Sequence, residues 1–472
     1  MRPKIRRVRG RPIPQRATQC GMVLPYALFV TVLILILGLA FLQTSATESL
    51  VATRNVQRLQ ANAAAEYGIA RARAMADSQF GVWFAMTYNG SPLNWATSPY
   101  YSGHSICNLF TNQTVPSFST ATYSVVIEDL TGDVVTSGTY RIHGYGTVGT
   151  YTRQVSLDSQ ALTFASFGWL TNSENGVWFR TGDWLSGLIW TNGQFNIDGN
   201  PSFNGPVYSG SGTINYMNGG PPNDNPTFAD GITYNAGNIN ISSLISGGQI
   251  TAIQNAANSG GISEPSNSGR GYTLTFNPAG TFTLVKNGVG GMHPVAPVTL
   301  YNNAAISTIN GAFYFQDPVQ VSGTIDGQVT VATSSGNDID ITGNLVYSYP
   351  ATPASMFVAG FNQSDPLLTS KCALISGGNL VIDQTWSGGW TDMYVTAVCA
   401  SVTGSFENQY YTNSPQKTLH LYGGITQMTR GAVGTVSGTG FLKDYLYDTR
   451  FMTSPPPFLP PVGAQFSNWQ LH

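Results

Sequence analysis

Residues 22–42 are twenty-one consecutive positions without a charge, MVLPYALFVTVLILILGLAFL. A helix rises about 1.5 Å per residue, so this run spans roughly 31 Å, which matches the hydrocarbon core of a bilayer. Seven basic residues precede it: Arg2, Lys4, Arg6, Arg7, Arg9, Arg11 and Arg16. Because basic flanks stay in the cytoplasm, the pattern predicts a single-pass inner-membrane protein whose remaining mass is exported.

The helical pattern continues beyond the apolar run. From Gln43 to Ala76 the chain has no proline and one glycine. Four apolar residues recur there at helical spacing: Leu59, Ala63, Ala70 and Ala74. A cleaved secretory signal, the main alternative, has an apolar region of about 7–15 residues and ends at a small-residue site. We therefore expect one helical rod over residues 22–76, roughly 80 Å long.

The N-terminal segment resembles a known class of proteins. The stretch Gly21-Met22-Val23-Leu24-Pro25-Tyr26 is similar to type IV pilin and pseudopilin N-termini, in which a prepilin peptidase cuts after the glycine. The stretch AAAEYGIARARA, residues 63–74, is similar to the signature of the PilX-like type IV pilus assembly N-terminal family. The resemblance implies Gly21 and Met22 as processing residues, and Pro25, Tyr26 and Glu66 as residues of an assembly helix.

One position departs from that class. Major pilins carry a Glu at the fifth mature position, which by analogy meets the N-terminal amine of a neighbouring subunit, whereas this chain has Tyr26. The departure implies a minor or tip-type subunit, or a protein that stays in the membrane. Simpler interpretations stay open: Gly21 as an ordinary boundary residue, Pro25 as a favoured first-turn residue, and Glu66 as a solvated surface carboxylate.

A small sheet is predicted after the helix. Strand-like runs at 121–128, 138–149 and 152–162 are separated by turn residues. The last two runs resemble the strand pair that follows the helix in PilX-like proteins. Residues 77–120 contain scattered Trp, Tyr and Pro residues, and we expect an irregular loop there.

The rest of the chain, from about residue 165, predicts a large β domain. Charged residues make up only 9% of the whole chain, against about 25% in an average soluble domain. Between residues 319 and 349 short apolar runs alternate with Gly, Ser and Asn, and one set of apolar residues shares one parity: Val319, Val321, Ile325, Val329, Val331, Ile339, Ile341 and Leu345. Stacked short strands with polar turns predict a β-solenoid, with an elongated sandwich as the alternative.

This β domain also resembles a functionally uncharacterised bacterial domain that follows pilus-like N-termini. The resemblance rests on residues 186–210, 322–347, 423–451 and 455–461, and it implies no catalytic residues. We expect the Pro-rich end to seal the last rung of the solenoid. The predicted fold class is α+β, with a leader at 1–21, a helix at 22–76, a pilin-like sheet at 77–163 and a solenoid-like domain at 164–472.

The cysteines agree with export. Cys372 and Cys399 would close a loop of about 28 residues, and a disulfide between them is worth roughly 3.5 kcal/mol in the chain-entropy model. Free thiols are the alternative for this pair. Cys107 has no evident partner, and none of the four cysteines has metal-ligand spacing.

Charge and motifs exclude several functions. Beyond the leader the chain has 14 Lys and Arg against 23 Asp and Glu, a net charge of about −9, which argues against nucleic acid as a partner. No zinc-binding helix, nucleophile elbow or phosphate loop occurs. Asp326, Asp338 and Asp340 are candidates for Ca²⁺ binding or an acid cluster, although a solvated strand face is the favoured interpretation.

A second acidic and aromatic group lies in the stretch NSENGVWFRTGDW. Its residues Glu174, Asp183 and Trp184 are candidates for carbohydrate contact, with packing at the edge of a rung as the alternative. These groups form no recognisable catalytic set. We therefore expect no enzymatic activity, no metal and no cofactor.

Three functions of different classes remain open. The first is a pilus-like structural or assembly subunit with its N-terminus in the cytoplasm and its bulk in the periplasm or at the cell surface. Its partners would be other pilin-like subunits, inner-membrane pilus assembly proteins, the lipid bilayer and, if the leader is processed, a prepilin peptidase. The second is a stalked surface adhesin or carbohydrate-binding protein. The third, least favoured, is a solenoid enzyme acting on polysaccharide.

Overall fold

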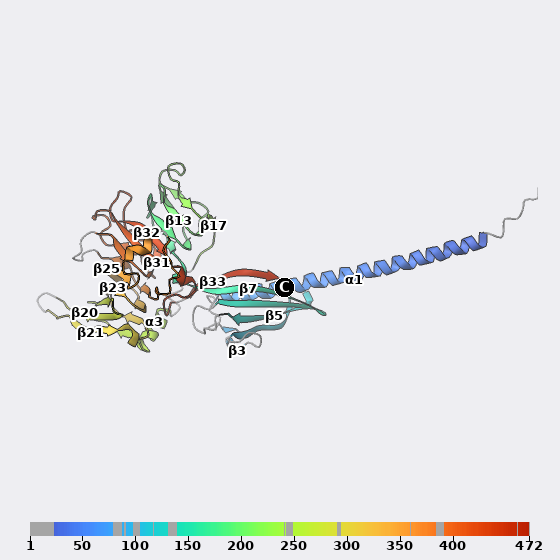
Figure 1. Ribbon diagram of the computed structural model, residues 1–472, viewed down its shortest axis with the longest axis horizontal. Helices are drawn as coiled ribbons and strands as arrows, with labels where there is room; N and C mark the ends of the chain where they lie inside the picture. Colours follow the sequence, from blue (N-terminus) through green and yellow to red (C-terminus); the bar gives the residue numbers. More distant parts are fainter. Residues whose placement is uncertain are drawn as a thin grey trace, which may run out of the picture.

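The computed structural model describes most of the chain after residue 22. The described ranges are 23–78, 87–88, 91–97, 104–116, 118–130, 139–239, 241, 249–289, 294–358, 360–383, 391–459 and 461–471. The predicted processing residues Gly21 and Met22 lie outside them. Figure 1 shows three parts in a row: a long helix, a small sheet beside its end, and a large β region beyond the sheet.

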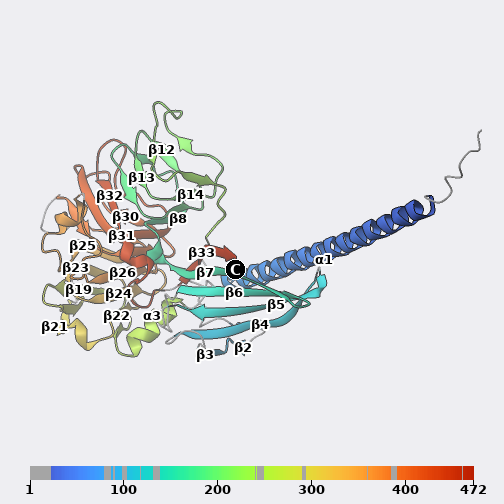
Figure 2. The same cartoon turned by 45° about the vertical axis from the view of Figure 1, so that its right-hand side comes forward.

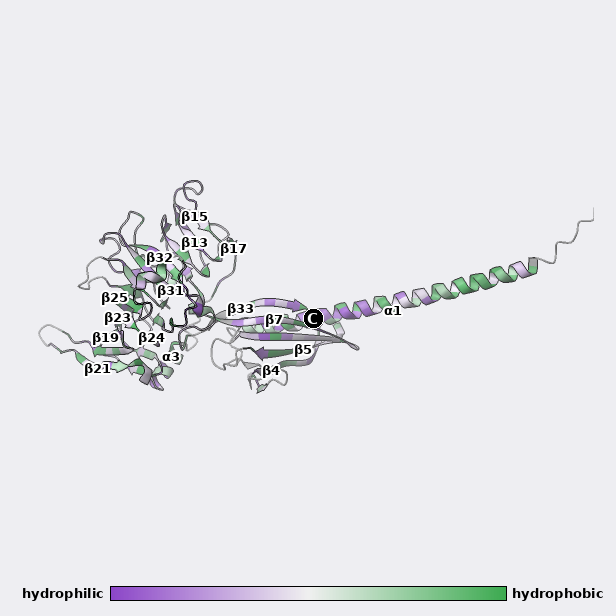
Figure 3. Ribbon diagram, viewed as in Figure 1, coloured by the Kyte–Doolittle hydropathy of each residue, from purple (hydrophilic) through white to green (hydrophobic). Residues whose placement is uncertain are grey.

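The predicted rod is confirmed as one continuous helix, α1, which runs from Val23 to Ser78 and has 56 residues. At helical rise it is about 84 Å long. Among the described residues it is the one helix long and apolar enough to cross a membrane. Figure 3 shows that its first half is almost uniformly apolar, whereas polar and apolar residues mix in the half that reaches the sheet.

The second half of α1 packs on the small sheet through a stripe of small residues. The buried residues of this stripe follow the period of a helix, with one adjacent pair: Ala61, Ala64, Ala65, Ile69, Ala72 and Ala76. Alanines let the helix backbone come close to the strands, because they carry no bulk beyond Cβ. Leu59, one of the apolar residues at helical spacing in the sequence, is 68% exposed and lies outside the stripe.

The small sheet has six antiparallel strands in the order β3-β4-β5-β6-β7-β33. The three predicted strands are confirmed as β5 (Phe118–Asp129), β6 (Thr139–Val148) and β7 (Tyr151–Thr163). The expected irregular loop at 77–120 is wrong in its second part, which contains β3 (Trp95–Thr97) and β4 (Ser105–Val115). A short hairpin, β1 (Thr87–Tyr88) and β2 (Ser91–Pro92), precedes them.

The chain returns to the small sheet at its C-terminal end. Strand β33 (Pro461–Leu471) pairs antiparallel with β7, with Pro461 opposite Thr163 and Leu471 opposite Val155. The prediction that this end seals a rung is therefore wrong, because its strand bonds to the small sheet. The chain leaves the small sheet through β7, forms the large β region, and re-enters the sheet through the neighbouring strand β33, as Figure 2 shows.

Most of the large β region consists of short parallel strands in two long stacks. The first stack, in spatial order, is β17 (Ile232–Tyr234), β14 (Val207–Ser209), β11 (Ile189–Thr191), β8 (Trp169–Ser173), β31 (Lys417–Thr429), β29 (Val398–Ser401), β26 (Lys371–Ser376), β24 (Gln328–Thr333), β22 (Ala312–Phe315) and β18 (Ile262–Glu264). Every pair in this order is parallel and in register without a bulge.

The second stack runs beside the first and shares β31 with it. On one side of β31 its strands are β32 (Phe441–Tyr447), β10 (Trp184–Ser186), β13 (Ser202–Asn204) and β16 (Thr227–Phe228). On the other side they are β28 (Met393–Val395) and β30 (Phe406–Asn408), β27 (Leu380–Ile382), β25 (Ile339–Tyr347), β23 (Val319–Ile325) and β19 (Tyr272–Asn277). Two antiparallel strands, β20 (Thr281–Lys286) and β21 (Val298–Ala305), extend its far end.

A third, short stack and one helix complete the region. The stack consists of β9 (Phe179–Arg180), β12 (Asn196–Asp198) and β15 (Asn215–Tyr216). Helix α3 (Gln249–Asn258) lies against the β18–β22 end of the first stack, with Ile253 and Ala257 in the core. The structure therefore confirms the α+β class, with one long helix and a largely β body.

The strands do not stack in chain order. Strand β8 pairs with β31, and β10 pairs with β32, although more than two hundred residues separate the members of each pair. The chain thus starts in the middle of the stack, runs to one end, crosses to the other end at β18, and returns to the middle. Both connections to the small sheet consequently lie at the centre of the region.

The predicted core of the β region is confirmed. All eight apolar residues of one parity between residues 319 and 345 are fully buried. Successive strands approach so closely that some positions admit only glycine. At Gly323 the φ angle is 109°, and an added Cβ would lie 2.1 Å from the Phe276 carbonyl oxygen of the neighbouring strand.

Candidate functional site

The apolar half of α1 is the most unusual surface of the molecule. Its large side chains between Leu24 and Leu42 are 36–79% exposed, and no other described segment covers them. Tyr26, in the first turn beside Pro25, is 72% exposed. Soluble proteins rarely expose an apolar patch larger than a few hundred Å², so this half of the helix requires lipid or other helices around it.

Two threonine hydroxyls in and just after this half are satisfied inside the helix. Thr31 donates its hydroxyl hydrogen to the Ala27 carbonyl oxygen at 2.7 Å, and Thr44 does the same to Ala40 at 2.9 Å. In an apolar medium an unpaired hydroxyl would cost free energy, because no water is present to form a hydrogen bond with it. The Thr31 hydroxyl is therefore compatible with lipid and with a helix bundle.

The other half of α1 is held against the sheet by glycines. A Cβ on Gly146 of β6 would lie 1.9 Å from the Ala61 carbonyl oxygen, and one on Gly144 would lie 2.7 Å from the Ala65 carbonyl oxygen. Glycine is therefore required where helix and strand backbones touch. This contact is not among the features predicted from the sequence, although a signal for it is present: two glycines two residues apart share one strand face, opposite the alanines of the helix.

Arginines extend this contact at its margins. Arg71 donates a hydrogen bond to the Tyr123 hydroxyl and lies 4.6 Å from the centre of the Phe110 ring. Arg73 lies 4.8 Å from the Phe466 ring on the C-terminal strand. Glu66, the predicted assembly carboxylate, lies on the exposed side of the helix, where another chain could reach it.

A bidentate ion pair ties the C-terminal strand to the sheet. Arg141 donates to both carboxylate oxygens of Asp158, at 2.7 and 3.2 Å, and the Asn468 amide donates to the same carboxylate at 2.9 Å. Burial acts to raise the pKa of Asp158, but the bonds from Arg141 and Asn468 outweigh it and hold the pKa below its usual value. Strands β6, β7 and β33 are thereby joined through one carboxylate.

The cysteines of the β region are free thiols. Cys372 and Cys399 are both fully buried and are not bonded to each other, so the predicted disulfide is not part of the structure. The register explains this, because Leu374 and not Cys372 lies opposite Cys399 on the neighbouring strand. Cys107 is also free, and burial raises the pKa of its thiol to about 11.

The acidic candidates of the sequence separate into different environments. Asp326 is exposed in the turn between β23 and β24, whereas Asp338 accepts a hydrogen bond from the Asn379 backbone at 2.6 Å. Burial, and then the carboxylates of Asp338 and Asp383, raise the pKa of Asp340 to about 6. Within the described ranges no group of three or more His, Cys, Asp or Glu residues could hold a metal ion.

Two of the three candidates for carbohydrate contact form buried ion pairs, so the prediction of carbohydrate contact is wrong for these two residues. Glu174 accepts a hydrogen bond from Arg430 at 2.7 Å, and Asp183 accepts one from Lys443 at 2.6 Å. Both pairs lie where β8 and β10 meet β31 and β32. Trp184, the third residue of that group, is half-buried and lines a surface hollow.

Comparisons with known proteins add little to this geometry. No protein-family model matches the chain, and no curated protein matches it. Among solved structures, the competence-associated pilin ComZ from Thermus thermophilus aligns with 88% of this chain and 97% of that one, at 12% sequence identity and a TM-score of 0.31. Function has therefore to be inferred from the geometry of the chain itself.

Proposed function

We propose that the protein is a membrane-anchored, pilus-like structural or assembly subunit that presents a large exported β region. The observation that carries this proposal is the division of α1 into an uncovered apolar half and a half fixed to an antiparallel sheet by glycines and alanines. The bilayer covers the apolar half first, and the helices of other pilin-like subunits cover it after assembly.

The sequence supports the orientation and the class of partner. Seven basic residues before the helix favour an N-terminus in the cytoplasm and a bulk in the periplasm or at the cell surface. A prepilin peptidase would cut between Gly21 and Met22, and inner-membrane assembly proteins would then receive the helix. Tyr26, where major pilins have Glu, supports a minor subunit.

We infer that the two parallel stacks are the coils of a β-solenoid. In-register parallel pairing through ten strands of the first stack, with an inner face that is buried in all but the end strands, supports a solenoid more than a sandwich, whose sheets are antiparallel. Such a region suits presentation at a distance from the membrane. Adhesion is the role we propose for it, and a catalytic role is not part of the proposal.

Processing of the leader tests the assembly role. The full chain is co-expressed with a prepilin peptidase, and the N-terminus of the membrane-extracted protein is sequenced. We expect a free Met22 in the wild type and an intact leader in Gly21→Leu. Gly10→Leu, also in the leader, is the matched control and should be cut normally. An intact leader in the wild-type protein, or normal cutting of Gly21→Leu, would count against pilin-type processing.

A further inference from the structure

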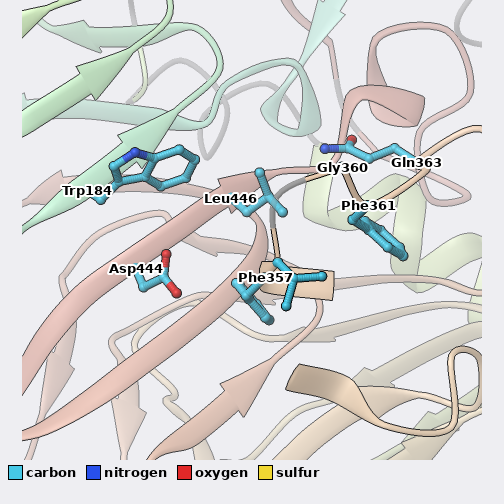
Figure 4. A pocket seen from close by; sticks show the side chains of 8 residues that line it. Trp184, Phe357, Gly360, Phe361, Gln363, Asp444 and Leu446 are labelled. Carbon is cyan, nitrogen blue, oxygen red and sulfur yellow. The ribbon is translucent and has the colours of Figure 1, made fainter. Parts of the chain in front are cut away.

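A hollow of about 440 Å³ opens on the outer face of the β region. We call it the Trp184 hollow; its walls include Trp184 of β10, Asp444 and Leu446 of β32, and Phe357, Phe361 and Gln363 from the segment that follows β25. Figure 4 shows Trp184 and Asp444 on one side, Phe361 and Gln363 on the other, and Leu446 between them. This volume lies within the range of ligand pockets, about 300–1,000 Å³.

A row of three rings and one carboxylate extends from the hollow along the strands. The register places Tyr394, His420, Asp444 and Trp184 opposite one another on four consecutive strands. The Tyr394 and His420 rings are stacked, with centroids 4.6 Å apart and planes 10° apart. Phe357 lies 4.9 Å from the His420 ring and connects the row to the wall of the hollow. Neighbouring strands are about 4.8 Å apart, so the row forms a strip in which the Asp444 carboxylate lies between the His420 and Trp184 rings.

The polar groups of the hollow are held in fixed orientations. His420 Nδ1 lies 2.6 Å from Asp444 Oδ2, which leaves the other carboxylate oxygen, Oδ1, without a hydrogen bond to any described residue. Gln363 accepts hydrogen bonds from the backbone and hydroxyl groups of Thr449, both at 2.8 Å, through its Oε1. The Gln363 amide hydrogens therefore remain available to a ligand.

We propose that the Trp184 hollow binds a neutral glycan chain. Sugar rings combine apolar C–H faces with hydroxyl rims, which match half-buried aromatic rings beside an oriented carboxylate and amide. The Asp444 carboxylate disfavours anionic ligands such as nucleic acids or uronic acid polymers. The strip from Trp184 to Tyr394 then guides the chain beyond the hollow. This inference rests on the proposed display of the β region, since a glycan reaches the hollow only when the β region lies outside the membrane.

Calorimetric titration of the full chain in detergent micelles tests the proposal. The probes are the neutral hexasaccharides of cellulose, chitin and starch, and polygalacturonate serves as the acidic comparison. We expect at least one neutral hexasaccharide to bind and polygalacturonate to bind more weakly. Trp184→Ala should weaken the binding roughly tenfold, and Trp184→Phe should restore part of it, because the ring face remains. Asp444→Asn should weaken it less, since one hydrogen bond loses its charge.

Trp190→Ala is the matched control. This tryptophan stacks on Tyr208 at 4.8 Å in the first strand stack, away from the hollow, and its loss should leave glycan binding unchanged. The proposal is overturned if none of the three neutral glycans binds or if polygalacturonate binds best. It is also overturned if Trp184→Ala and Trp190→Ala change glycan binding equally. Leader processing of the same variants is measured separately, so that a failure of glycan binding is distinguishable from a failure of the assembly role.

Discussion

Gly146 shows how one residue determines the position of α1 on the small sheet. Because a Cβ there would lie 1.9 Å from the Ala61 carbonyl oxygen, the Gly146→Ala variant must push helix and strand apart. We expect it to lower the free energy of unfolding by about 1–3 kcal/mol, as overpacked cores do. Thermal unfolding in detergent measures this loss, with the protease resistance of the small sheet as the readout.

Gly193→Ala is the control for that experiment. A Cβ at Gly193 would meet no atom closer than 3.7 Å, and its φ angle is ordinary, so the stability of the protein should not change. Equal losses in the two variants would show that the close approach at Gly146 does not hold the helix.

Asp340 makes stability depend on pH. Burial and two neighbouring carboxylates raise its pKa from 3.8 in the unfolded chain to about 6 in the folded protein. The stability that the neutral carboxyl contributes is therefore fully present below about pH 4 and is lost as the pH rises through 6. Asp340→Asn should stabilise the protein at pH 7.5 by about 1–2 kcal/mol, after a discount for partial exposure, and should have little effect at pH 4.

Denaturant unfolding at the two pH values checks this prediction. Asp326→Asn, at an exposed position, should behave like the wild type at both. A stabilisation by Asp340→Asn that is equal at pH 4 and pH 7.5 would be inconsistent with a shifted carboxyl pKa.

Individual side chains were only partly predictable from the sequence. The parity of Val319 and its neighbours correctly gave the inner face of the strands, because alternation along one strand is a local property. Glu174 and Asp183 are, from the sequence, candidates for carbohydrate contact or for packing at the edge of a rung. Their partners Arg430 and Lys443 lie more than two hundred residues away. No local sequence pattern predicts an ion pair between residues so far apart in the chain.

At the scale of elements, two buried ion pairs join the halves of the β region. Lys443→Met leaves Asp183 buried without its partner, and we expect a loss of about 3–5 kcal/mol in the free energy of unfolding. Lys417→Met, at the start of β31 and half-buried, should cost far less. Urea unfolding of the two variants measures the difference, and similar midpoints would argue against a stabilising role for the Asp183–Lys443 pair.

The elements themselves were predictable where their pattern was long. Helix α1 and strands β5 to β7 were expected because each shows its period over many residues. Strands β4 and β33 were missed, since Asn, Gln and Thr interrupt the apolar pattern of β4, and β33 is defined by its pairing with β7, about three hundred residues away. Likewise, the meeting of β8 with β31 follows from long-range packing, which local patterns do not show.

The whole molecule is a rod attached to a β region through two neighbouring strands. Because β7 leaves the small sheet beside the point where β33 enters it, the β region is connected to the sheet at two adjacent points instead of one flexible linker. A displacement of α1 would thus be transmitted to the β region. This arrangement suits the proposed role, in which assembly proteins move the subunit while it presents a large domain.

Cross-linking of the apolar half of α1 in the native membrane tests the assembly role most directly. A photo-reactive phenylalanine derivative replaces Leu35, which is 60% exposed, and in a control it replaces Thr352, which is exposed on the β region. The account predicts light-dependent adducts between position 35 and a second pilin-like subunit, and none of these from position 352. Adducts of position 35 with lipid alone would contradict it, because the helix would then be a membrane anchor and not an assembly helix.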